Sequence, residues 1–591
     1  MSHLKKLLRF AAPYSRRSLL ALLLLTTLVV FDLSIPRLIQ TLIDHGIAQH
    51  DRGVVLRTSA LMLGISLLSV FIAIGNNNLS VFVGESVGRD LREAIFVKIQ
   101  SFSYGNLDRQ NTGQLLVRLS SDTSAIQRLL QMSLRIGTRA PLLMIGSLVL
   151  MITTSLELAL TMIPLLLVTT FVIIFFLIKM EPMYRFVQQK LDRLNTVLQE
   201  NVAGIRLVKA FVRQRHERAR FELNNLAYTE ESVKVMQFAA FMSPVLTLCV
   251  NGGIVIVIWA GGLQAAHGKL SSGQLVAFIN YLLTTMTPLL MMTILSNVWA
   301  SGIASAKRID EVLNVVPEIQ DAPDASALEL SGAPRIEFED VSFSYAASQA
   351  EPVLDGVSFV AEPGETVAIL GATGAGKSTL VKLIPRFYDV TRGRVLLGGR
   401  DVRELSQDSL LSQIGVVPQE SVLFSGTVRD NIRYGKPEAS DGEVLRAARA
   451  AQADEFISKL DQGYDARVEQ RGQNFSGGQR QRLAIARALL LEPKILILDD
   501  STSAVDVETE TKIQQALAAQ HPEQTRIVVA QRISSVLGAD KILVLDAGRI
   551  VARGRHAELM KSSRVYQEIY ASQLGTGITP ESVAESAAVN S

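Results

Sequence analysis

The sequence predicts an α-helical membrane bundle followed by an α/β domain that holds a phosphate-binding loop. Three observations lead to this fold class. Six long apolar segments occupy the first half of the chain, a strand–glycine loop–helix pattern starts at Thr366, and a second apolar strand ends in Asp499 and Asp500. At 591 residues the chain is too long for one hydrophobic core, so several domains are expected.

The six apolar segments approach or exceed the roughly 20 residues that a helix needs to cross a bilayer. They are approximately Ser18–Ile43, Val54–Phe82, Ile136–Thr154, Leu158–Ile178, Phe238–Ala260 and Gln274–Val298. The first follows a basic stretch, but its apolar part is too long for a signal peptide and has no small-residue cleavage site. We therefore predict six transmembrane helices, the first of which is retained.

The distribution of basic residues predicts the orientation of these spans. The links after the first, third and fifth spans are short and hold few cations, chiefly Arg52 and Lys269, whereas the links after the second and fourth are long and basic. Positive charge marks the cytoplasmic side. We therefore expect both termini and both long links in the cytoplasm, and a multi-pass protein in the cytoplasmic (inner) membrane. The net charge of +3 is too small an excess to suggest nucleic acid as a partner.

Both long links are expected to be helical. Glu85–Phe102 and Glu181–Val233 contain almost no proline and keep a helical apolar spacing. The spans would then continue tens of ångströms into the cytoplasm, at about 1.5 Å per residue. One break is expected in each link, around Tyr104–Asn106 and near Asn201–Gly204. Such extensions indicate mechanical coupling to a cytoplasmic domain; a simple helical hairpin is the alternative.

The stretch Gly371–Thr379 fits the phosphate-binding pattern G-x-x-x-x-G-K-[ST] at every fixed position. Its glycines let backbone N–H groups surround phosphate oxygens, Lys377 can reach the β- and γ-phosphates, and Ser378 can ligate Mg²⁺. The pattern predicts binding of a nucleoside triphosphate with Mg²⁺. The expected binding residues are Gly371, Thr373, Gly374, Ala375, Gly376, Lys377, Ser378 and Thr379.

A second nucleotide element is the apolar strand Lys494–Leu498, which ends in Asp499 and Asp500. Asp499 is placed to hold Mg²⁺ directly or through water, and Asp500 to orient the water that attacks the γ-phosphate. Earlier in the chain, Tyr345 follows an alternating strand that begins at Arg335. Its ring either stacks on adenine or is an ordinary strand aromatic.

Between these elements, Ser476-Gly477-Gly478-Gln479 resembles the signature of ATP-binding cassette transporters. The resemblance extends from about Leu4 to Leu574 and is to exporter half-transporters, in which six spans precede one cassette. It implies ATP hydrolysis coupled to transport, and a cassette with an antiparallel β subdomain and a helical subdomain. It also implies a dimer in which each signature faces the ATP held by the opposite subunit.

By the same resemblance, Tyr345 matches the adenine-stacking aromatic, Gln419 a residue that senses Mg²⁺ and the membrane domain, and Asp506 a loop that crosses the dimer interface. Asn111–Arg118 and Asn201–Lys209 look like the family's coupling elements. The expected divisions are a membrane domain at 1–310, a linker at 311–334, a nucleotide-binding domain at 335–573 and a disordered tail at 574–591.

Two positions of the expected catalytic site depart from the family pattern. Asp500 stands where glutamate is usual, and its shorter side chain withdraws the carboxylate by roughly 1.5 Å from the attacking water. Gln531 replaces the usual histidine and cannot take a positive charge near the γ-phosphate. Because Lys377, Ser378 and Asp499 are retained, we interpret the site as one kept for binding. The favoured assembly is a heterodimer whose partner half-transporter supplies the glutamate and the histidine.

Two alternative functions remain compatible with the catalytic candidates Asp500, Gln531 and Gln419. One is a homodimeric exporter of lipids or peptides that tolerates both substitutions. The other is an ATP-binding regulator or gated membrane protein with little turnover. Under the favoured hypothesis the substrate is a lipophilic or amphipathic small molecule.

Polar residues within the apolar spans are candidates for a substrate cavity. They are Asp32, Asn76, Asn251 and Asn280. Ionisable residues at membrane depth are functional candidates by default, and Asp32 could meet cationic substrates. The asparagines could instead hold helices together through interhelical hydrogen bonds.

Overall fold

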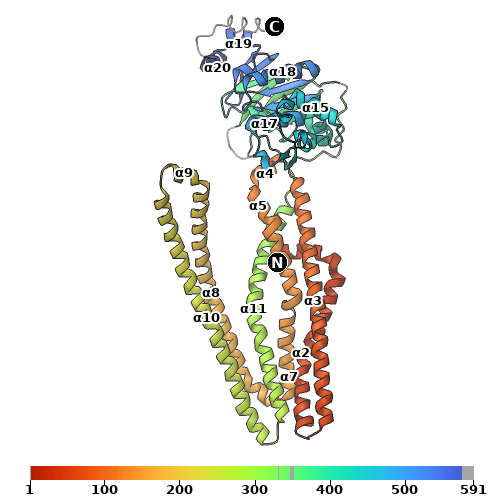
Figure 1. Ribbon diagram of the computed structural model, residues 1–591, viewed down its shortest axis with the longest axis vertical. Coiled ribbons are helices and arrows are strands. Elements are labelled where there is room, and N and C mark those ends of the chain that lie inside the picture. Colours follow the sequence, from red (N-terminus) through yellow and green to blue (C-terminus); the bar gives the residue numbers. More distant parts are fainter. Residues whose placement is uncertain (1, 331, 346–351, 575–591) are drawn as a thin grey trace. The chain divides into compact units, whose positions relative to one another are not determined.

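The computed structural model describes residues 2–330, 332–345 and 352–574. These residues fall into two compact units. The first contains Met1–Gln100 and Thr112–Val315, and the second contains Ser101–Asn111 and Val316–Ser591 (Figure 1). Beyond Leu574, the predicted disordered tail lies outside the described residues.

The first unit consists of helices, of which α3, α8, α10 and α11 are the longest. The helices are α1 (Ser2–Leu7), η1 (Leu8–Tyr14), α2 (Ser15–Thr41), η2 (Leu42–Ile47), α3 (Arg52–Gln100), α5 (Thr112–Val117), η3 (Arg118–Asp122), α6 (Thr123–Met132), η4 (Ser133–Gly137), α7 (Arg139–Thr154), α8 (Leu156–Ala203), α9 (Ile205–Ala210), α10 (Gln214–Ala266) and α11 (Ser272–Leu313). At 49 residues, α3 is about 70 Å long, more than twice the thickness of a bilayer's hydrocarbon core.

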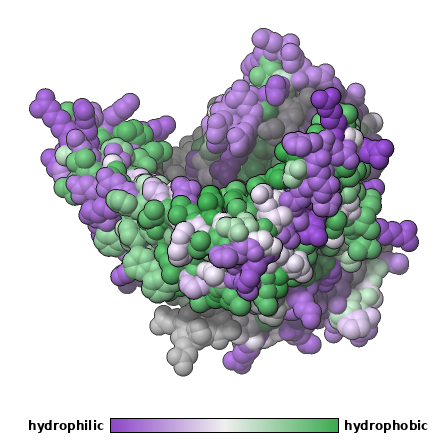
Figure 2. All heavy atoms as spheres, turned by 90° about the horizontal axis from the view of Figure 1, so that it is seen from below, coloured by the Kyte–Doolittle hydropathy of each residue, from purple (hydrophilic) through white to green (hydrophobic). Residues whose placement is uncertain are grey.

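In the described part of the chain, five helical stretches are long and apolar enough to cross a membrane. They include α2, α3, α7, α8 and α10, and α11 is a further continuous helix of 42 residues. Their outward side chains are apolar: Phe71, Phe171 and Trp259 are 69–71% exposed. Figure 2 shows apolar residues over much of the face seen along the helices. Such a surface is unfavourable in water and suits lipid.

The long links are helical, as the sequence predicts. α3 continues to Gln100, and α8 and α10 lie side by side with α9 at the end of their hairpin (Figure 1). Two breaks lie close to the predicted positions, but each link has a further break that was not predicted, between Arg109 and Thr112 and between Ala210 and Gln214. The first predicted break falls just before Tyr104, where helix α4 (Tyr104–Arg109) begins, and the second at Gly204.

The second unit contains a mainly parallel sheet whose described strands have the order β12-β11-β3-β10-β9-β6. These strands are β3 (Thr366–Gly371), β6 (Ile414–Val417), β9 (Ile495–Asp499), β10 (Thr525–Val529), β11 (Lys541–Asp546) and β12 (Arg549–Gly554). Every residue of β9 and β10 is buried, which agrees with their continuous apolar sequence, because both faces of a parallel sheet are covered.

A second sheet is antiparallel, with the order β2-β1-β4-β5 among the described strands. Its strands are β1 (Ile336–Phe343), β2 (Leu354–Ala361), β4 (Arg392–Leu397) and β5 (Arg400–Asp401). One core joins this sheet to β3 and to helix α12 (Lys377–Leu383), so the strand that leads into the phosphate loop is fixed from two sides.

A third group of elements in the second unit is chiefly helical and has its own core. It contains β7 (Gly426–Thr427), α14 (Val428–Ile432), η6 (Arg433–Gly435), α15 (Asp441–Ala450), α16 (Asp454–Ile457), η7 (Gly463–Asp465), β8 (Arg467–Val468), η8 (Gln470–Gly472) and α17 (Gly477–Leu489). The remaining elements are η5 (Val402–Glu404), α13 (Gln407–Ser412), α18 (Val507–Gln520), η9 (Ile533–Ser535), α19 (His556–Ser562) and α20 (Arg564–Leu574).

Candidate active site

The predicted catalytic residues meet at one edge of the parallel sheet. Strands β6, β9 and β10 run parallel and stay in register up to their carboxyl ends. Gln419, Asp500 and Gln531 follow these ends by one or two residues, which explains why positions far apart in sequence converge. On the other side of β10, β3 leads into the phosphate loop. Ligands of open α/β sheets bind at this edge.

The phosphate loop depends on its glycines at specific points. Gly374 and Gly376 have φ angles of 86° and 96°, a left-handed conformation that glycine adopts without strain. At Gly371 the constraint is a close approach, because a Cβ there would lie 2.1 Å from the carbonyl oxygen of Leu545. Thr373 and Gly374 are exposed at the crest of the loop, whereas Ala375 is buried at its base.

Lys377 is the buried cation of this loop. Its Nζ donates hydrogen bonds of 2.9 Å to the carbonyl oxygens of Gly371 and Ala372, which leaves one of its three donors unused. Burial lowers the pKa of Lys377, and the neighbouring Asp500 and Asp499 oppose that effect. The loop therefore holds a positively charged group next to backbone that is open to phosphate oxygens.

The two acids that follow β9 have different partners. Asp499 Oδ1 accepts a 2.7 Å hydrogen bond from Ser378 Oγ, and burial raises its pKa. Asp500 Oδ2 accepts from Gln531 Nε2 at 2.7 Å and from Gln419 Nε2 at 3.2 Å. Burial also raises the pKa of Asp500, and the nearby Asp499 adds to the effect. Asp500 has a φ of 49°, a strained backbone conformation that aspartate tolerates better than most residues.

The donor set suits a magnesium ion bound together with a nucleotide. Ser378 Oγ and Asp499 Oδ1 are adjacent oxygen ligands, and Gln419 lies on the other side of the acids. In the described part of the chain, no group of three or more His, Cys, Asp or Glu side chains gathers to hold a metal. Mg²⁺ does not need such a group, because it takes one or two protein ligands and completes its shell with phosphates and water.

Tyr345 lies beside the phosphate loop. Its hydroxyl and Thr379 Oγ1 are 3.0 Å apart, and its ring makes edge contacts with Phe343 and Tyr388. Tyr345 is 44% exposed, so part of it is open to solvent. This exposure is compatible with both interpretations of Tyr345, stacking on a planar base and an ordinary aromatic residue at the end of a strand.

The signature residues begin helix α17. Ser476 is the N-cap, and its hydroxyl accepts from the backbone N–H of Gln479 while the Gln479 side chain accepts from the N–H of Ser476. This reciprocal pair is a capping box. A Cβ on Gly478 would lie 2.8 Å from the carbonyl oxygen of Ala504, whereas one on Gly477 would meet only the Ala504 side chain, at 3.3 Å. Gly477 therefore faces more open space than Gly478.

Two residues that the sequence analysis missed fasten the loop before Asp506. Gln481 donates to Ser503 Oγ and accepts from the N–H of Ala504, and Arg532 donates to the carbonyl oxygens of Ser503 and Val505. Asp506 itself caps α18 by accepting from the N–H of Thr509. Arg532 directly follows Gln531 and Gln481 lies two residues after Gln479, but nothing in their spacing shows that they bind one loop.

The first long link divides between the two units. The stretch that packs in the second unit is Ser101–Asn111, which contains helix α4, whereas most of the predicted element Asn111–Arg118 belongs to the first unit. The ring of Tyr104 stacks on Phe387 with centroids 4.1 Å apart. The sequence gives no sign of this pairing, because aromatic residues in a link and in a loop carry no pattern that relates them.

Hydrogen bonds fix α4 in this position. Asn106 Nδ2 donates to the carbonyl oxygen of Val316, and Asn106 Oδ1 accepts from the N–H of Glu318. Tyr388 donates to Asp108 Oδ2 at 2.5 Å, and burial, reinforced by Asp108, raises the pKa of Tyr388. The hydroxyl therefore stays protonated and remains a donor at any physiological pH.

The polar residues predicted for a substrate cavity separate in the structure. Asp32 and Asn76 line one cavity of the first unit, and Asn251 and Asn280 are not among its lining residues. Asn76 donates to the carbonyl oxygen of Ala21 and so joins α3 to α2, in agreement with the alternative structural role. The expectation that Asp32 meets cationic substrates needs correction, because its carboxylate already pairs with Arg139 at 2.8 Å.

Apolar helices long enough to cross a bilayer and a phosphate loop with its acidic strand define the class of a membrane-bound P-loop nucleoside triphosphatase. The comparisons give the family. Residues 18–289 match the family model described as ABC transporter transmembrane region, and residues 354–503 match the family model described as ABC transporter. The chain belongs to the ABC transporter family: it is a transport ATPase of the half-transporter type, with an N-terminal transmembrane domain fused to a nucleotide-binding domain.

Individual relatives cover nearly the whole chain. It is 41% identical to YfiB, an uncharacterized ABC transporter ATP-binding protein of Bacillus subtilis, over 97% of this chain and 99% of that protein. It is 33% identical to an ATP-dependent lipid A-core flippase of Syntrophus aciditrophicus, over 96% of this chain and 94% of that one. A solved bacterial Atm1-family ABC exporter with ATP bound superposes with a TM-score of 0.81 at 29% identity, covering 96% of this chain and all of that chain.

Proposed function

We propose that this chain is half of a dimeric exporter that uses ATP to move lipophilic or amphipathic small molecules across the cytoplasmic membrane. It would cross the membrane six times, with α11 as the sixth span, and keep its nucleotide-binding domain in the cytoplasm. Similarity to an exporter and to a lipid A-core flippase supports an outward-moving, lipid-like cargo. ATP would bind on Tyr345 and the phosphate loop, with Ser378, Asp499 and Gln419 holding Mg²⁺.

We propose further that this chain's own site binds ATP without leading its hydrolysis. The observation that carries this proposal is the state of Asp500, which is one methylene short and whose Oδ2 accepts from the amides of both Gln531 and Gln419. A water that should be oriented for attack must compete with these two donors for a carboxylate that stands too far back. Signature residues from Ser476 to Gln479 would then complete the leading site on a partner half-transporter with glutamate and histidine.

The test uses the full chain purified alone in lipid nanodiscs, where any ATP-closed dimer contains two copies of it. We expect slow ATP hydrolysis, because both sites then carry Asp500 and Gln531. The double variant Asp500→Glu/Gln531→His should hydrolyse ATP about 100-fold faster, since both opposing signatures are intact and the carboxylate regains its reach. Photolabelling by an ATP analogue should be equal for the two proteins.

A different result would favour the homodimeric lipid or peptide exporter. In that case the natural chain alone would hydrolyse ATP rapidly, and Asp500→Asn would stop it. A gated membrane protein with little turnover would bind ATP but stay slow even as the double variant. Each of the three hypotheses therefore predicts its own pair of rates for the natural chain and the variants.

We propose in addition that α4, the part of the first long link that belongs to the second unit, takes part in coupling, and this gives a separate prediction. In Tyr388→Phe the ring stays in place but the hydrogen bond to Asp108 is lost, so α4 is held less firmly. We expect the stimulation of ATP hydrolysis by nanodisc lipid, relative to detergent, to fall by roughly fivefold or more. Tyr464→Phe is a matched control, because Tyr464 donates to Asp454 in the helical part of the domain. Equal loss of stimulation in both variants would contradict a coupling role for α4.

A further inference from the structure

The cavity that contains Asp32 has a volume of 620 Å³ and lies wholly within the first unit. This size falls in the range of small-molecule sites. Four helical stretches line it, namely α2, α3, α11 and the stretch formed by η4 and α7. The last is irregular at the cavity, because η4 is a π-helical segment that is separated from α7 by a single residue, Thr138. Segments of this kind often mark functional sites.

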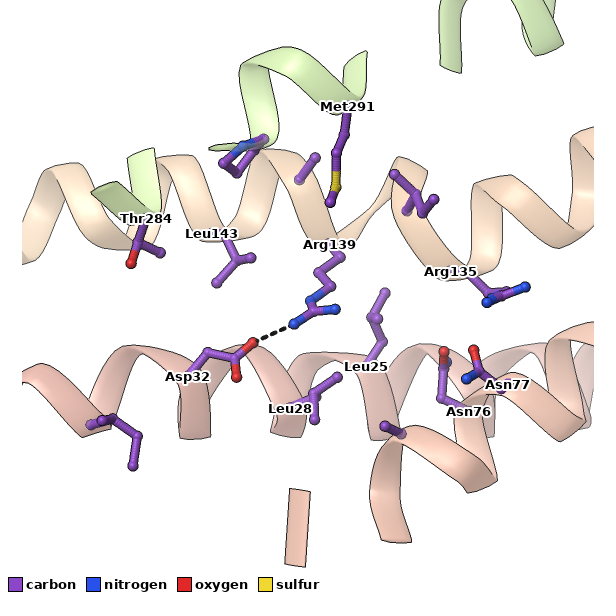
Figure 3. A pocket seen from close by; sticks show the side chains of 15 residues that line it. Leu25, Leu28, Asp32, Asn76, Asn77, Arg135, Arg139, Leu143, Thr284 and Met291 are labelled. Carbon is purple, nitrogen blue, oxygen red and sulfur yellow. Dashed lines mark hydrogen bonds and ion pairs between the residues drawn. The ribbon is translucent and has the colours of Figure 1, made fainter. Parts of the chain in front are cut away.

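The charges in the cavity do not balance. Arg135, Arg139 and Asp32 all line it, so the three side chains leave one excess positive charge. Figure 3 shows Arg139 reaching from its helix to Asp32 on the helix opposite, while Arg135, one turn away, lines the cavity on the side of Asn76 and Asn77. No hydrogen bond or ion pair of Arg135 is found within the described residues. A cation without a partner is costly at membrane depth and is a functional candidate.

The donors of Arg139 are also incompletely used. One terminal nitrogen donates to Asp32, but its Nε is buried and has no hydrogen-bond partner among the described residues. A buried donor of this kind is unfavourable until an acceptor reaches it. The planar guanidinium offers paired donors that match the two oxygens of a carboxylate or phosphate. An anionic group between Arg139 and Arg135 would satisfy both the excess charge and the free donors.

Apart from Asn76, Asn77 and Thr284, the rest of the wall is apolar. The apolar lining residues include Leu25, Leu28, Ile136, Leu143, Pro288 and Met291. An inorganic anion would leave this wall without contact, whereas an alkyl chain would cover it and gain from leaving water.

From this arrangement we infer that the cavity binds the anionic head group of an amphipathic molecule, with its alkyl chain against the leucine wall. The inference rests on the proposed function, because it assigns this amphiphile as the exported substrate. Arg135 and Arg139 bind the head group. Asp32 holds Arg139 in position and, by its own negative charge, keeps the binding of the anion weak enough for release.

The binding test uses the full chain in nanodiscs of zwitterionic phosphatidylcholine, without nucleotide. The probes are a fluorescent C18 fatty acid and the alcohol of the same chain. We expect the natural protein to bind the acid about tenfold more tightly than the alcohol, and Arg135→Gln to lose this preference. Asp32→Asn should bind the acid at least threefold more tightly, because Arg139 is then free and a repelling charge is gone.

Two further variants control for structural damage. Arg37→Gln removes an exposed arginine of α2 that donates to Gln40 and does not line the cavity, so the preference for the acid should remain. Arg135→Lys keeps the charge and should keep most of the preference, even if Arg135→Gln folds poorly. Equal affinity of the natural protein for acid and alcohol would overturn the inference, and so would weaker binding of the acid by Asp32→Asn.

A second measurement separates an exported substrate from a resident bilayer lipid. The acid should stimulate ATP hydrolysis and leave the cytoplasmic leaflet when ATP is added, and both effects should be lost in Arg135→Gln. Binding that depends on Arg135 but changes neither quantity would identify a resident lipid and overturn the assignment as substrate. Binding is measured without nucleotide, so it does not depend on transport. If the proposed transport function is wrong, the binding result therefore still holds, and the two failures can be told apart.

Discussion

Replacing Gly477 by aspartate should reduce ATP hydrolysis by the assembled transporter by about 100-fold or more. In the head-to-tail dimer that we propose, the N-terminus of α17 faces the γ-phosphate bound by the opposite subunit. An added carboxylate there repels the phosphate and blocks closure of the two domains. The measurement is steady-state hydrolysis in nanodiscs, with assembly of each variant checked by size-exclusion chromatography.

Gly477 is a better position for this test than its neighbour. The Cβ of a residue at 477 meets the Ala504 side chain at 3.3 Å, which a small shift relieves, and aspartate is favourable in the first turn of a helix. At Gly478 the Cβ would lie 2.8 Å from a backbone carbonyl, so a substitution there would disturb the loop itself. Gly477→Asn is the matched neutral control and should retain clearly more activity than Gly477→Asp. Equal rates for these two variants would show that no anion approaches this helix end.

Local sequence patterns predicted the elements that carry the nucleotide. The phosphate loop was predictable because its glycines and its lysine are required by one tight backbone path, as Gly374 and Gly376 show. The long helices were predictable from apolar length, since a bilayer sets that length. Only the approximate positions of the helix breaks could be predicted, and the first lies just before Tyr104.

Contacts between distant segments could not be predicted in the same way. The pairing of Asp32 with Arg139 joins residues 107 positions apart, and neither position belongs to a motif. For this reason the sequence suggested that Asp32 binds cationic substrates, whereas the cavity that Asp32 lines has an excess of positive charge. The packing of α4 against Phe387, and the fastening of a loop by Gln481, depend likewise on where the fold brings side chains together.

Replacing Lys377 by alanine should weaken ATP binding to this chain by about 10- to 100-fold. Lys377 supplies the mobile cation of the phosphate loop, and Asp499 and Asp500 lie close enough to influence its pKa. Without it, two carboxylates face the incoming phosphates and the cation of the loop itself is missing. The measurement is photolabelling of the chain by a reactive ATP analogue over a range of concentrations.

Lys377→Met separates the loss of charge from the loss of volume. Methionine fills most of the space of the lysine but carries no charge, so it should weaken binding as much as alanine does. Both variants should keep the melting temperature of the nucleotide-free protein within a few degrees, because the bonds that Lys377 makes to Gly371 and Ala372 are offset by the cost of burying its charge. Lys459→Ala, which changes an exposed lysine paired with Glu455, should leave labelling unaffected. Full labelling of both Lys377 variants would show that ATP is held elsewhere in the chain.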